Sequence, residues 1–409
     1  MTGAISWLLL ERMLRVVSGV LVSTAVARYL GPASYGTLAV SLGVVGVASA
    51  AASMGADHVN LAQLSRQPGP GFLASALIAR MLWSAVCALA LVGVAAIVWP
   101  GQLQLFVVLG GMVLATAPLV FVHQMYADDQ FRGATAFGIA AIGVAVAARL
   151  AGVAWHFDLA WFAACAVLES AATVLAAGVW AWRRGAWRPS SASLVQAARY
   201  LQLCLPTLAS AVLVALYFRI ELLVVDSVLG AAAVGTWSAA MMFILPWNMA
   251  SAAILPVVNR RLGTLSGEPT ASRALMVKLV RVMLALSGAC VLANIIAVQF
   301  AVPLLLGPRY ADAARVATIA SLALVPLFLG AVQDVWLAQS GRNAVVLRKV
   351  LVGIPLSVAL LWAGASRAGL AGAAAGMVVS YLVTAILLNA VLDRGFLNIQ
   401  LAAIGVGRA

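Results

Sequence analysis

Long apolar runs separated by short polar turns make up almost the whole chain. A transmembrane helix needs about 20 mainly apolar residues, and twelve windows of that kind can be found. They fall at 4–27, 35–56, 72–98, 103–125, 134–154, 159–182, 201–228, 233–257, 276–303, 315–337, 344–363 and 370–392. The pattern therefore predicts an all-α integral membrane protein with about twelve transmembrane helices.

A short phrase at the end of the first window recurs 199 residues later. Leu30–Thr37 (LGPASYGT) aligns with Leu229–Thr236 (LGAAAVGT), with Leu, Gly, Gly and Thr at the same places in both. Six predicted spans separate the copies, so both halves enter the membrane in the same direction, as a parallel repeat. We expect two six-helix lobes, 1–190 and 191–409, with the path of a transporter substrate between them.

Lysine and arginine are distributed unevenly over the predicted connections. With the N-terminus inside, fifteen lie in cytoplasmic connections and the C-terminal tail, and four lie on the other side. Because cytoplasmic loops carry the excess of Lys and Arg, both termini are expected in the cytoplasm. The first apolar run is too long for a signal-peptide core and contains Glu11, Arg12 and Arg15, so we expect it to remain as the first span.

Composition agrees with lipid as the solvent. Only 9% of residues are charged, 64% are hydrophobic, and the mean hydropathy is +1.07, whereas about a quarter of the residues are charged in a soluble domain. The net charge of +13 would suggest nucleic acid in a soluble protein, but here it follows the loops, and no nucleic-acid partner is expected. The four cysteines lie inside apolar runs, as small buried hydrophobes do.

The most basic and aromatic connection, residues 182–189 (WRRGAWRP), lies between the sixth and seventh predicted spans, where the repeat places the link between the halves. One interpretation is an anchor to lipid headgroups. The alternative is a regulatory or partner contact.

Eleven ionisable residues fall inside predicted spans. They are Glu11, Arg12, Arg15, Arg80, Arg149, Glu169, Arg219, Glu221, Asp226, Arg281 and Asp334. A charge at the bilayer centre costs about 2.5–3.5 kcal/mol on insertion scales, so such groups are expected to face a partner or a wet cavity. Arg281 and Asp334 lie near the cytoplasmic face and Asp226 near the outer face, where side chains can reach water.

Arg12 and Arg15 stand out because they share one face of the first span, about 4.5 Å apart along the helix axis. Glu11 lies one turn before Arg15 and can pair with it. Two interpretations remain open: this face lines a cavity, or it forms a structural ion-pair cluster that ties the first helix to its neighbours.

Arg80, Arg149 and Glu169 add to the charges of the first half, which sum to +2 with those of the first span. A positive site favours an anionic group such as phosphate, because guanidinium groups bind phosphate oxygens bidentately. In the seventh span Arg219 and Glu221 are two residues apart and point to nearly opposite sides, so either can face the seam. The candidate substrate-binding residues are therefore Arg12, Arg15, Arg80, Arg149 and Arg219.

The carboxylates Glu11, Glu169 and Glu221 are candidates for charge balance or for binding a coupling ion. Glu169 has no arginine beside it in the sequence and is the preferred proton carrier. His123 and Asp128-Asp129 are interpreted as solvated loop residues rather than metal ligands. The sequence contains no nucleotide-binding loop, catalytic triad or zinc motif, so no catalytic residue, metal or cofactor is expected, and neither is ATP-driven transport within this chain.

Several short motifs resemble one family. They are Arg28–Gly36, the stretch from Ser53-Met54-Gly55-Ala56 to Leu64-Ser65-Arg66, Arg219-Ile220-Glu221 through Gly235, and Leu306–Ala311. They are similar to bacterial O-antigen and exopolysaccharide (Wzx-like) flippases of the multidrug/oligosaccharidyl-lipid/polysaccharide (MOP) superfamily. The resemblance covers nearly the whole chain, although each motif is short. Members often carry Asp where this chain has Glu221.

The resemblance implies two six-helix lobes around a central cavity, as in MATE transporters. It also implies flipping of an undecaprenyl-diphosphate-linked oligosaccharide from the cytoplasmic to the outer leaflet of the bacterial inner membrane, for cell-surface polysaccharide synthesis. The arginines would then hold the diphosphate. Expected partners are this substrate, membrane lipids, a coupling proton or sodium ion, and polysaccharide polymerase or assembly proteins. The chain lacks the two additional C-terminal helices of lipid II flippases, which favours the polysaccharide branch.

Two other functions remain as alternatives. The first is a drug or metabolite cation antiporter on the same fold, which would require unpaired carboxylates. The second is a membrane glycan polymerase or ligase. Such enzymes usually carry large outward loops, whereas here every outward connection is about ten residues or fewer, as counted between the predicted windows.

Overall fold

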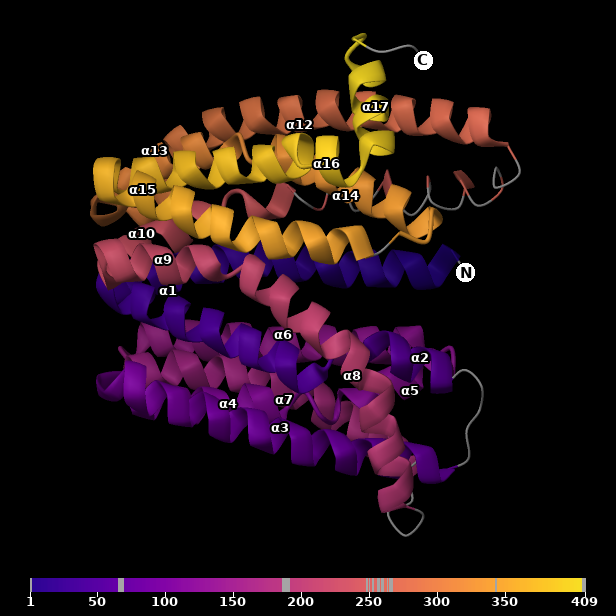
Figure 1. The fold of residues 1–409 in the computed structure, drawn as a ribbon. Helices are drawn as coiled ribbons and strands as arrows, with labels where there is room; N and C mark the ends of the chain where they lie inside the picture. The colour runs from indigo at the N-terminus through magenta and orange to yellow at the C-terminus, as the bar shows by residue number, and fades with distance from the viewer. Residues whose placement is uncertain are drawn as a thin grey trace. The chain divides into compact units, whose positions relative to one another are not determined.

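The computed structural model describes residues 2–64, 70–185, 192–247, 268–342 and 344–406, together with scattered positions between 249 and 264. The side chains of residues 2–10 and of Arg12 lie outside this description, as do the connection residues Trp187, Arg188 and Pro189. In the described part all regular structure is helical (Figure 1).

Eight described helices are long and apolar enough to cross a membrane, or nine if one bent pair is a single span. The bent pair is α13 (Ala311–Ser321) and α14 (Leu324–Gln339), which meet at 44°. The protein is therefore an all-helical, multi-pass membrane protein. The number twelve stays a prediction, because the structure joins some of the predicted spans and breaks others.

Four helices follow predicted spans closely, since each run is bounded by clear polar turns. They are α3 (Pro70–Val98), α6 (Phe131–Ala154), α7 (Leu159–Arg183) and α12 (Pro269–Leu306). The Asp158 side chain caps α7 by accepting a hydrogen bond from the backbone N–H of Trp161 at 3.2 Å, which satisfies a donor at the helix N-terminus.

Two long helices each take the place of two predicted spans. α1 (Thr2–Ser53) covers 4–27 and 35–56, and α15 (Ala344–Leu382) covers 344–363 and the start of 370–392. Both contain non-helical residues where the sequence predicts a turn. Gly31 has φ 74° and ψ 168°, and Gly369 has φ 59° and ψ −144°. Glycine adopts these positive φ values without the steric penalty of a side chain.

Two other predicted spans are broken. The window 103–125 is divided into α4 (Leu103–Leu114) and α5 (Leu119–Ala127), with Pro118 before α5; proline lacks the N–H that a continuous helix needs. The window 201–228 becomes α8 (Leu194–Tyr217) and α9 (Ile220–Leu229). α10 (Ala231–Met241) follows Gly230, whose φ is 82°.

The chain divides into two compact units. Unit 1 comprises Met1–Leu30 and Leu38–Arg219, and unit 2 comprises Gly31–Thr37 and Ile220–Ala409. The main division lies after Arg219 rather than at 190/191, because α8 packs against α3 of unit 1. The six-helix lobes stay a prediction.

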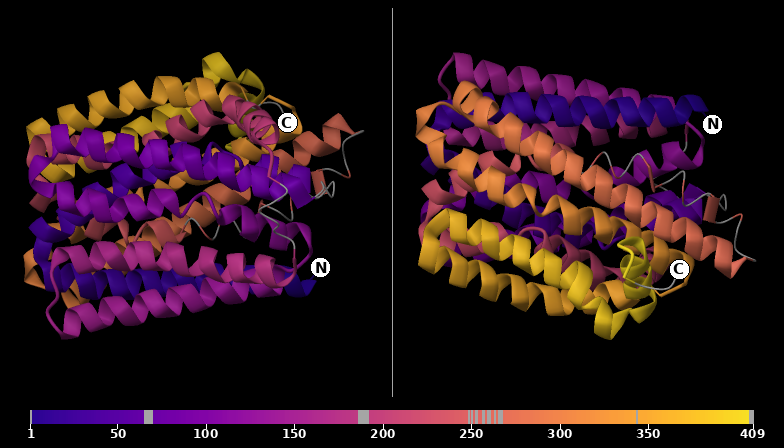
Figure 2. Two further views of the ribbon diagram at one scale, coloured as in Figure 1. Left: turned by 90° about the horizontal axis from the view of Figure 1, so that it is seen from below. Right: turned by 90° about the horizontal axis from the view of Figure 1, so that it is seen from above.

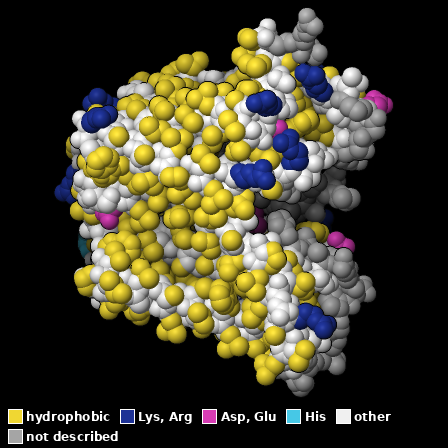
Figure 3. All heavy atoms as spheres, viewed as in Figure 1, with side chains coloured by type: hydrophobic (Ala, Val, Ile, Leu, Met, Phe, Trp, Pro, Cys, Tyr) yellow, Lys and Arg dark blue, Asp and Glu magenta, His cyan; other side chains and the backbone are white. Residues whose placement is uncertain are grey.

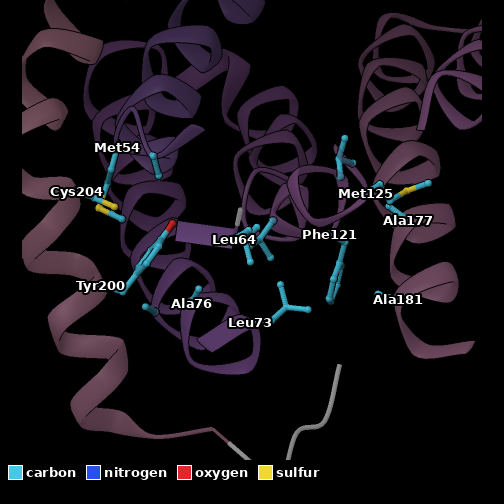
Figure 4. Packing of buried hydrophobic residues seen from close by; sticks show 14 of the residues in the cluster. Met54, Leu64, Leu73, Ala76, Phe121, Met125, Ala177, Ala181, Tyr200 and Cys204 are labelled. Atoms are coloured by element: carbon cyan, nitrogen blue, oxygen red, sulfur yellow. The ribbon is translucent and has the colours of Figure 1, made fainter. Parts of the chain in front are cut away.

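In unit 1, α3 packs against α4 and α8, and α7 packs against α4, α5 and α6; α2 (Asp57–Leu64) packs against α5. Figures 1 and 2 show α3, α4, α6 and α7 running alongside one another. A buried apolar cluster joins α2, α3, α5, α6 and α7 to α8, with Met54, Phe121, Met125, Tyr200 and Cys204 among its members (Figure 4).

In unit 2, α9 packs against α15, while α12 packs against α13, α14 and α17 (Arg394–Ala403). Arg281 of α12 donates hydrogen bonds to the carbonyls of Ala402 and Ala403 at 3.1 and 3.0 Å, and so satisfies the C-terminus of α17. Over α12 to α17, hydrophobic side chains cover the visible helix faces and Lys and Arg side chains gather near the helix ends (Figure 3). This distribution is typical of helices surrounded by lipid.

Candidate functional site

Three helices of unit 1 bring four charged side chains together. Arg15 of α1 donates from Nη1 to Glu169 Oε1 of α7 at 2.7 Å and from Nη2 to Glu11 Oε1 at 3.2 Å. Arg149 of α6 donates from Nη2 to the other oxygen of Glu169, Oε2, at 2.9 Å. Glu169 therefore bridges two arginines from two other helices. We call these four residues the charged cluster.

Local sequence features explain why these side chains meet. Glu11 and Arg15 are one helical turn apart, so they lie on the same face of α1. Gly138 of α6 leaves space for the Glu11 carboxylate, since a Cβ there would lie 2.6 Å from Oε1. Further along, Trp161 of α7 donates to the carbonyl of Ala148 of α6 at 2.9 Å, which fixes these two helices beside each other near Arg149.

The side chains of the charged cluster form ion pairs with one another but remain partly exposed. The Arg15 side chain is 48% exposed, whereas those of Glu11, Glu169 and Arg149 are 18%, 21% and 25% exposed. The two arginines and two glutamates balance each other, and Arg12, whose side chain lies outside the described residues, adds one formal positive charge. Arg15 is therefore the member that can exchange its partner for a ligand most readily.

The cluster revises one interpretation of the sequence. Glu169 was preferred as a proton carrier because no arginine lies beside it in the sequence. In the folded chain Arg15 and Arg149 both form ion pairs with it. The sequence spacing did not show these two partners, and the coupling role of Glu169 stays a prediction.

Arg80 of α3 lies apart from the charged cluster. Its side chain is fully buried, and its Nη2 donates to the carbonyl of Thr116 at 2.6 Å, in the break between α4 and α5. Nε and Nη1 have no hydrogen-bond partner within the described residues. The Thr116 carbonyl also accepts from the backbone N–H of Leu119 at 3.4 Å. Carbonyls at a helix C-terminus carry partial negative charge, which stabilises a cation there. In this conformation Arg80 caps a broken helix and contacts no solvent.

Arg219 and Glu221 lie on either side of the break between α8 and α9. Arg219 is exposed, and its side chain passes close to Gly46 of α1. A Cβ added to Gly46 would lie 3.7 Å from Arg219 Nε. Glu221 is half-buried in the first turn of α9. Neither residue is part of the charged cluster.

Unit 2 contains a buried polar network that the sequence analysis missed. Gln333 of α14 accepts a hydrogen bond from Lys349 and donates to Asn389 and Asp393 at 2.8 and 3.3 Å. Arg342 forms an ion pair with Asp393 at 2.9 Å. Asn389 also donates to the Ala385 carbonyl at 2.7 Å, within the π-helical turn Val383–Leu387.

This network satisfies the backbone at the π-helical turn. Gln400 of α17 also donates to Ala385, at 3.0 Å, and accepts from Asn389 at 3.1 Å. π-helical turns are common at functional sites, but here the contacts of the network join α14 to α15, and α14 and α17 to α16 (Asn389–Leu392). In the sequence, this network could have been predicted from the uncharged amide side chains of Gln333, Asn389 and Gln400, which lie in or beside apolar runs.

A smaller network in unit 1 includes His123. Its Nδ1 lies 3.0 Å from the side-chain nitrogen of Asn60, whose oxygen accepts from the Tyr200 hydroxyl at 2.8 Å. His123 therefore contacts the fully buried Asn60, in contrast to the solvated residue expected; Asp128 and Asp129 are exposed. Among the described residues no group of three or more His, Cys, Asp or Glu side chains is placed to hold a metal ion.

Comparison with known proteins identifies both fold and family. The fold is similar to that of a MATE family multidrug resistance transporter of the MOP superfamily in an inward-facing conformation, with TM-score 0.72, 15% identity and 98% of each chain covered. It is also similar to the lipid II flippase MurJ, with TM-score 0.71, 13% identity and coverage of 97% of this chain and 90% of that chain. A MOP superfamily transporter from Pyrococcus furiosus matches with TM-score 0.56 and 14% identity, over 99% and 94% of the two chains.

The sequence finds no significant match among curated proteins. Residues 25–315, well over half of the chain, match the family described as "Polysaccharide biosynthesis protein". The fold is similar to that of solved membrane transporters. The chain therefore belongs to the polysaccharide biosynthesis protein family and has the fold of solved MOP superfamily transporters.

Proposed function

We propose that this transporter moves an undecaprenyl-diphosphate-linked oligosaccharide from the cytoplasmic to the outer leaflet without ATP. Family membership supports a substrate from polysaccharide synthesis. The charged cluster supports an anionic group on that substrate, because two guanidinium groups meet on one carboxylate inside membrane helices.

The half-exposed Arg15 carries the proposal. In this structure its guanidinium is held by Glu11 and Glu169. A diphosphate offers more negative charge and more acceptor oxygens than a carboxylate, so it can replace Glu169 as the partner of Arg15 and Arg149. Glu169 released in this way becomes available to a coupling proton or sodium ion, and Glu11 and Glu221 remain candidates for the same task.

The other predicted substrate-binding arginines contribute differently to this proposal. Arg12 adds one formal positive charge three residues before Arg15, while Arg219 lies at the break after α8. Arg80 takes part only if α3 moves, because its buried side chain already binds the Thr116 carbonyl.

The test is Arg15→Ala in a cell that depends on this protein for surface polysaccharide. We expect export to be lost while the protein level on an immunoblot stays unchanged. Arg15→Lys keeps the charge but not the planar fork, so partial export is expected. Arg199→Ala is the matched control, since Arg199 is an exposed arginine of unit 1 outside the charged cluster. Full export by Arg15→Ala would remove Arg15 from the mechanism.

A cation antiporter is the second candidate, because the same fold is found in a multidrug resistance transporter. Binding of an organic cation requires an unpaired carboxylate, whereas Glu11 and Glu169 are both bound by arginine. This function predicts resistance to cationic drugs on expression and no change in surface polysaccharide. A drug-resistance assay and a surface-polysaccharide assay on the same cells therefore separate the two candidate functions.

A further inference from the structure

Two apolar grooves run along the lipid-facing side of α7 in unit 1. The first, of about 560 Å³, lies between α7 and Phe137 of α6, and the second, of about 330 Å³, lies between α7 and the region of Pro118 and Phe121. Leu175 and Val179 line both grooves and form the ridge between them. Their side chains are 66% and 47% exposed, so the ridge faces the surrounding lipid.

Both grooves lead to a basic and aromatic helix end. Arg183 and Arg184 line the end of the first groove, and Trp182 lines the second. The Arg184 guanidinium lies over the Trp180 ring, 5.4 Å from its centroid, which holds the side chain in place while leaving its charge unbalanced. Neither arginine has an ion-pair partner among the residues that the structure describes.

The local electrostatics favour an anion. The C-terminus of α7 carries a partial charge of about −0.5, which is much smaller than the two full positive charges of the arginines. Backbone N–H groups of Arg184 and Gly185 already bind the carbonyls of Trp180 and Trp182. The uncompensated charge at this end therefore belongs to the guanidinium groups.

We propose that the C-terminal end of α7 binds an anionic phospholipid of the surrounding membrane. The phosphate lies against Arg183 and Arg184, and the two acyl chains lie in the two grooves, on either side of the Leu175–Val179 ridge. Exposed tryptophan beside the arginines is typical of the headgroup level of a bilayer. The charge asymmetry of the loops places this end in the cytoplasmic leaflet. This site does not depend on what the protein transports.

The experiment reconstitutes the full chain in phosphatidylcholine nanodiscs with increasing phosphatidylglycerol and counts retained lipids by native mass spectrometry. We expect preferential retention of phosphatidylglycerol by the wild type, decreasing as salt is raised. Arg183→Gln with Arg184→Gln should reduce that preference by about fivefold for each arginine. Arg199→Gln, which removes an exposed arginine of unit 1 outside the grooves, should leave it unchanged.

Ala176→Phe tests the grooves without changing charge, since Ala176 lines the first one. Ala176→Phe should reduce retention of phosphatidylcholine and phosphatidylglycerol equally, because it fills space for an acyl chain and leaves the arginines in place. Absence of a phosphatidylglycerol preference in the wild type, an unchanged preference in the double variant, or an equal loss in Arg199→Gln would each overturn the proposal. Displacement of phosphatidylglycerol by an equal amount of a polyprenyl phosphate would also overturn it, because the grooves would then belong to the substrate tail. If the double variant does not fold, the salt dependence of the wild type is the test. A preference for phosphatidylglycerol that does not change with salt would overturn the proposal, because binding by the arginines must weaken as salt is raised.

Discussion

Gly36 and Gly235, which occupy the same position in the two copies of the repeated phrase, lie directly against each other in unit 2. A Cβ added to Gly36 would lie 1.7 Å from the Ala231 carbonyl oxygen and 2.7 Å from the Gly235 nitrogen. A Cβ added to Gly235 would lie 1.9 Å from the Pro32 carbonyl oxygen. Since Pro32 and Ala231 are also equivalent positions, the contact is reciprocal. The repeat therefore marks a symmetric backbone contact that only glycine permits.

We expect Gly36→Ala and Gly235→Ala each to destabilise the protein by about 1–3 kcal/mol or more, because a methyl group would overlap backbone atoms that have little freedom to move. The measurement is the melting temperature in detergent, followed by tryptophan fluorescence. Gly93→Ala is the matched control, since Gly93 lies within α3 and a Cβ there would meet no atom within 4 Å. Equal melting temperatures for all three variants would contradict the reciprocal contact.

Glu169→Gln should increase affinity for a diphosphate. The substitution removes the negative charge that holds both Arg15 and Arg149, so an anionic ligand no longer has to displace it. Binding of a soluble polyprenyl diphosphate analogue to purified protein measures the effect. Glu11→Gln should change affinity less, because among the described side chains Glu11 pairs with Arg15 alone, at the longer distance of 3.2 Å. Weaker binding by Glu169→Gln would mean that Glu169 positions the arginines rather than competing for them.

Arg80→Met separates a structural role from a role in transport. Arg80 has no solvent contact in this conformation, and Met is an apolar side chain of similar length that removes, among the hydrogen bonds of the described residues, only the one to the Thr116 carbonyl. We therefore expect surface polysaccharide export to continue in this variant. Loss of export at a normal protein level would place Arg80 in the translocation path.

Arg342→Met should destabilise unit 2 by about 1–3 kcal/mol, because the buried Asp393 carboxylate loses its ion-pair partner and keeps only the more distant charge of Lys349. The Asp393 side chain is fully buried and that of Arg342 is 44% exposed. Combining Arg342→Met with Asp393→Asn should restore much of the loss, since a neutral amide needs no counter-ion. Thermal unfolding of the two variants measures both effects. No recovery in the double variant would assign the loss to the Arg342 contact with the Leu392 carbonyl.

The sequence predicts local features well and distant contacts poorly. The bounds of α3, α6 and α7 follow from continuous apolar runs between polar turns, and the Glu11–Arg15 pair follows from helical spacing. The contact between Arg15 and Glu169 joins positions 154 residues apart, and no periodicity within one helix contains that information.

Like the contacts between distant positions, the burial of individual charged side chains could not be predicted from the sequence. Arg80 and Arg149 look alike in sequence, as single arginines in apolar runs, but one is fully buried against a carbonyl and the other pairs with Glu169. The Gln333–Asn389 contact does not follow from the distribution of charges inside the spans, because both side chains are uncharged amides. Uncharged amides in apolar helices are equally in need of partners.

The division of the chain has a consequence for its biogenesis. Residues Gly31–Thr37 belong to unit 2, although the residues on both sides of them belong to unit 1. Their packing partner, the segment around Gly235, is synthesised 199 residues after Gly36, which at about 5–20 residues per second corresponds to roughly 10–40 s. During that interval the ribosome synthesises the remainder of unit 1. Residues Gly31–Thr37 cannot form their contacts in unit 2 until the segment around Gly235 has been made.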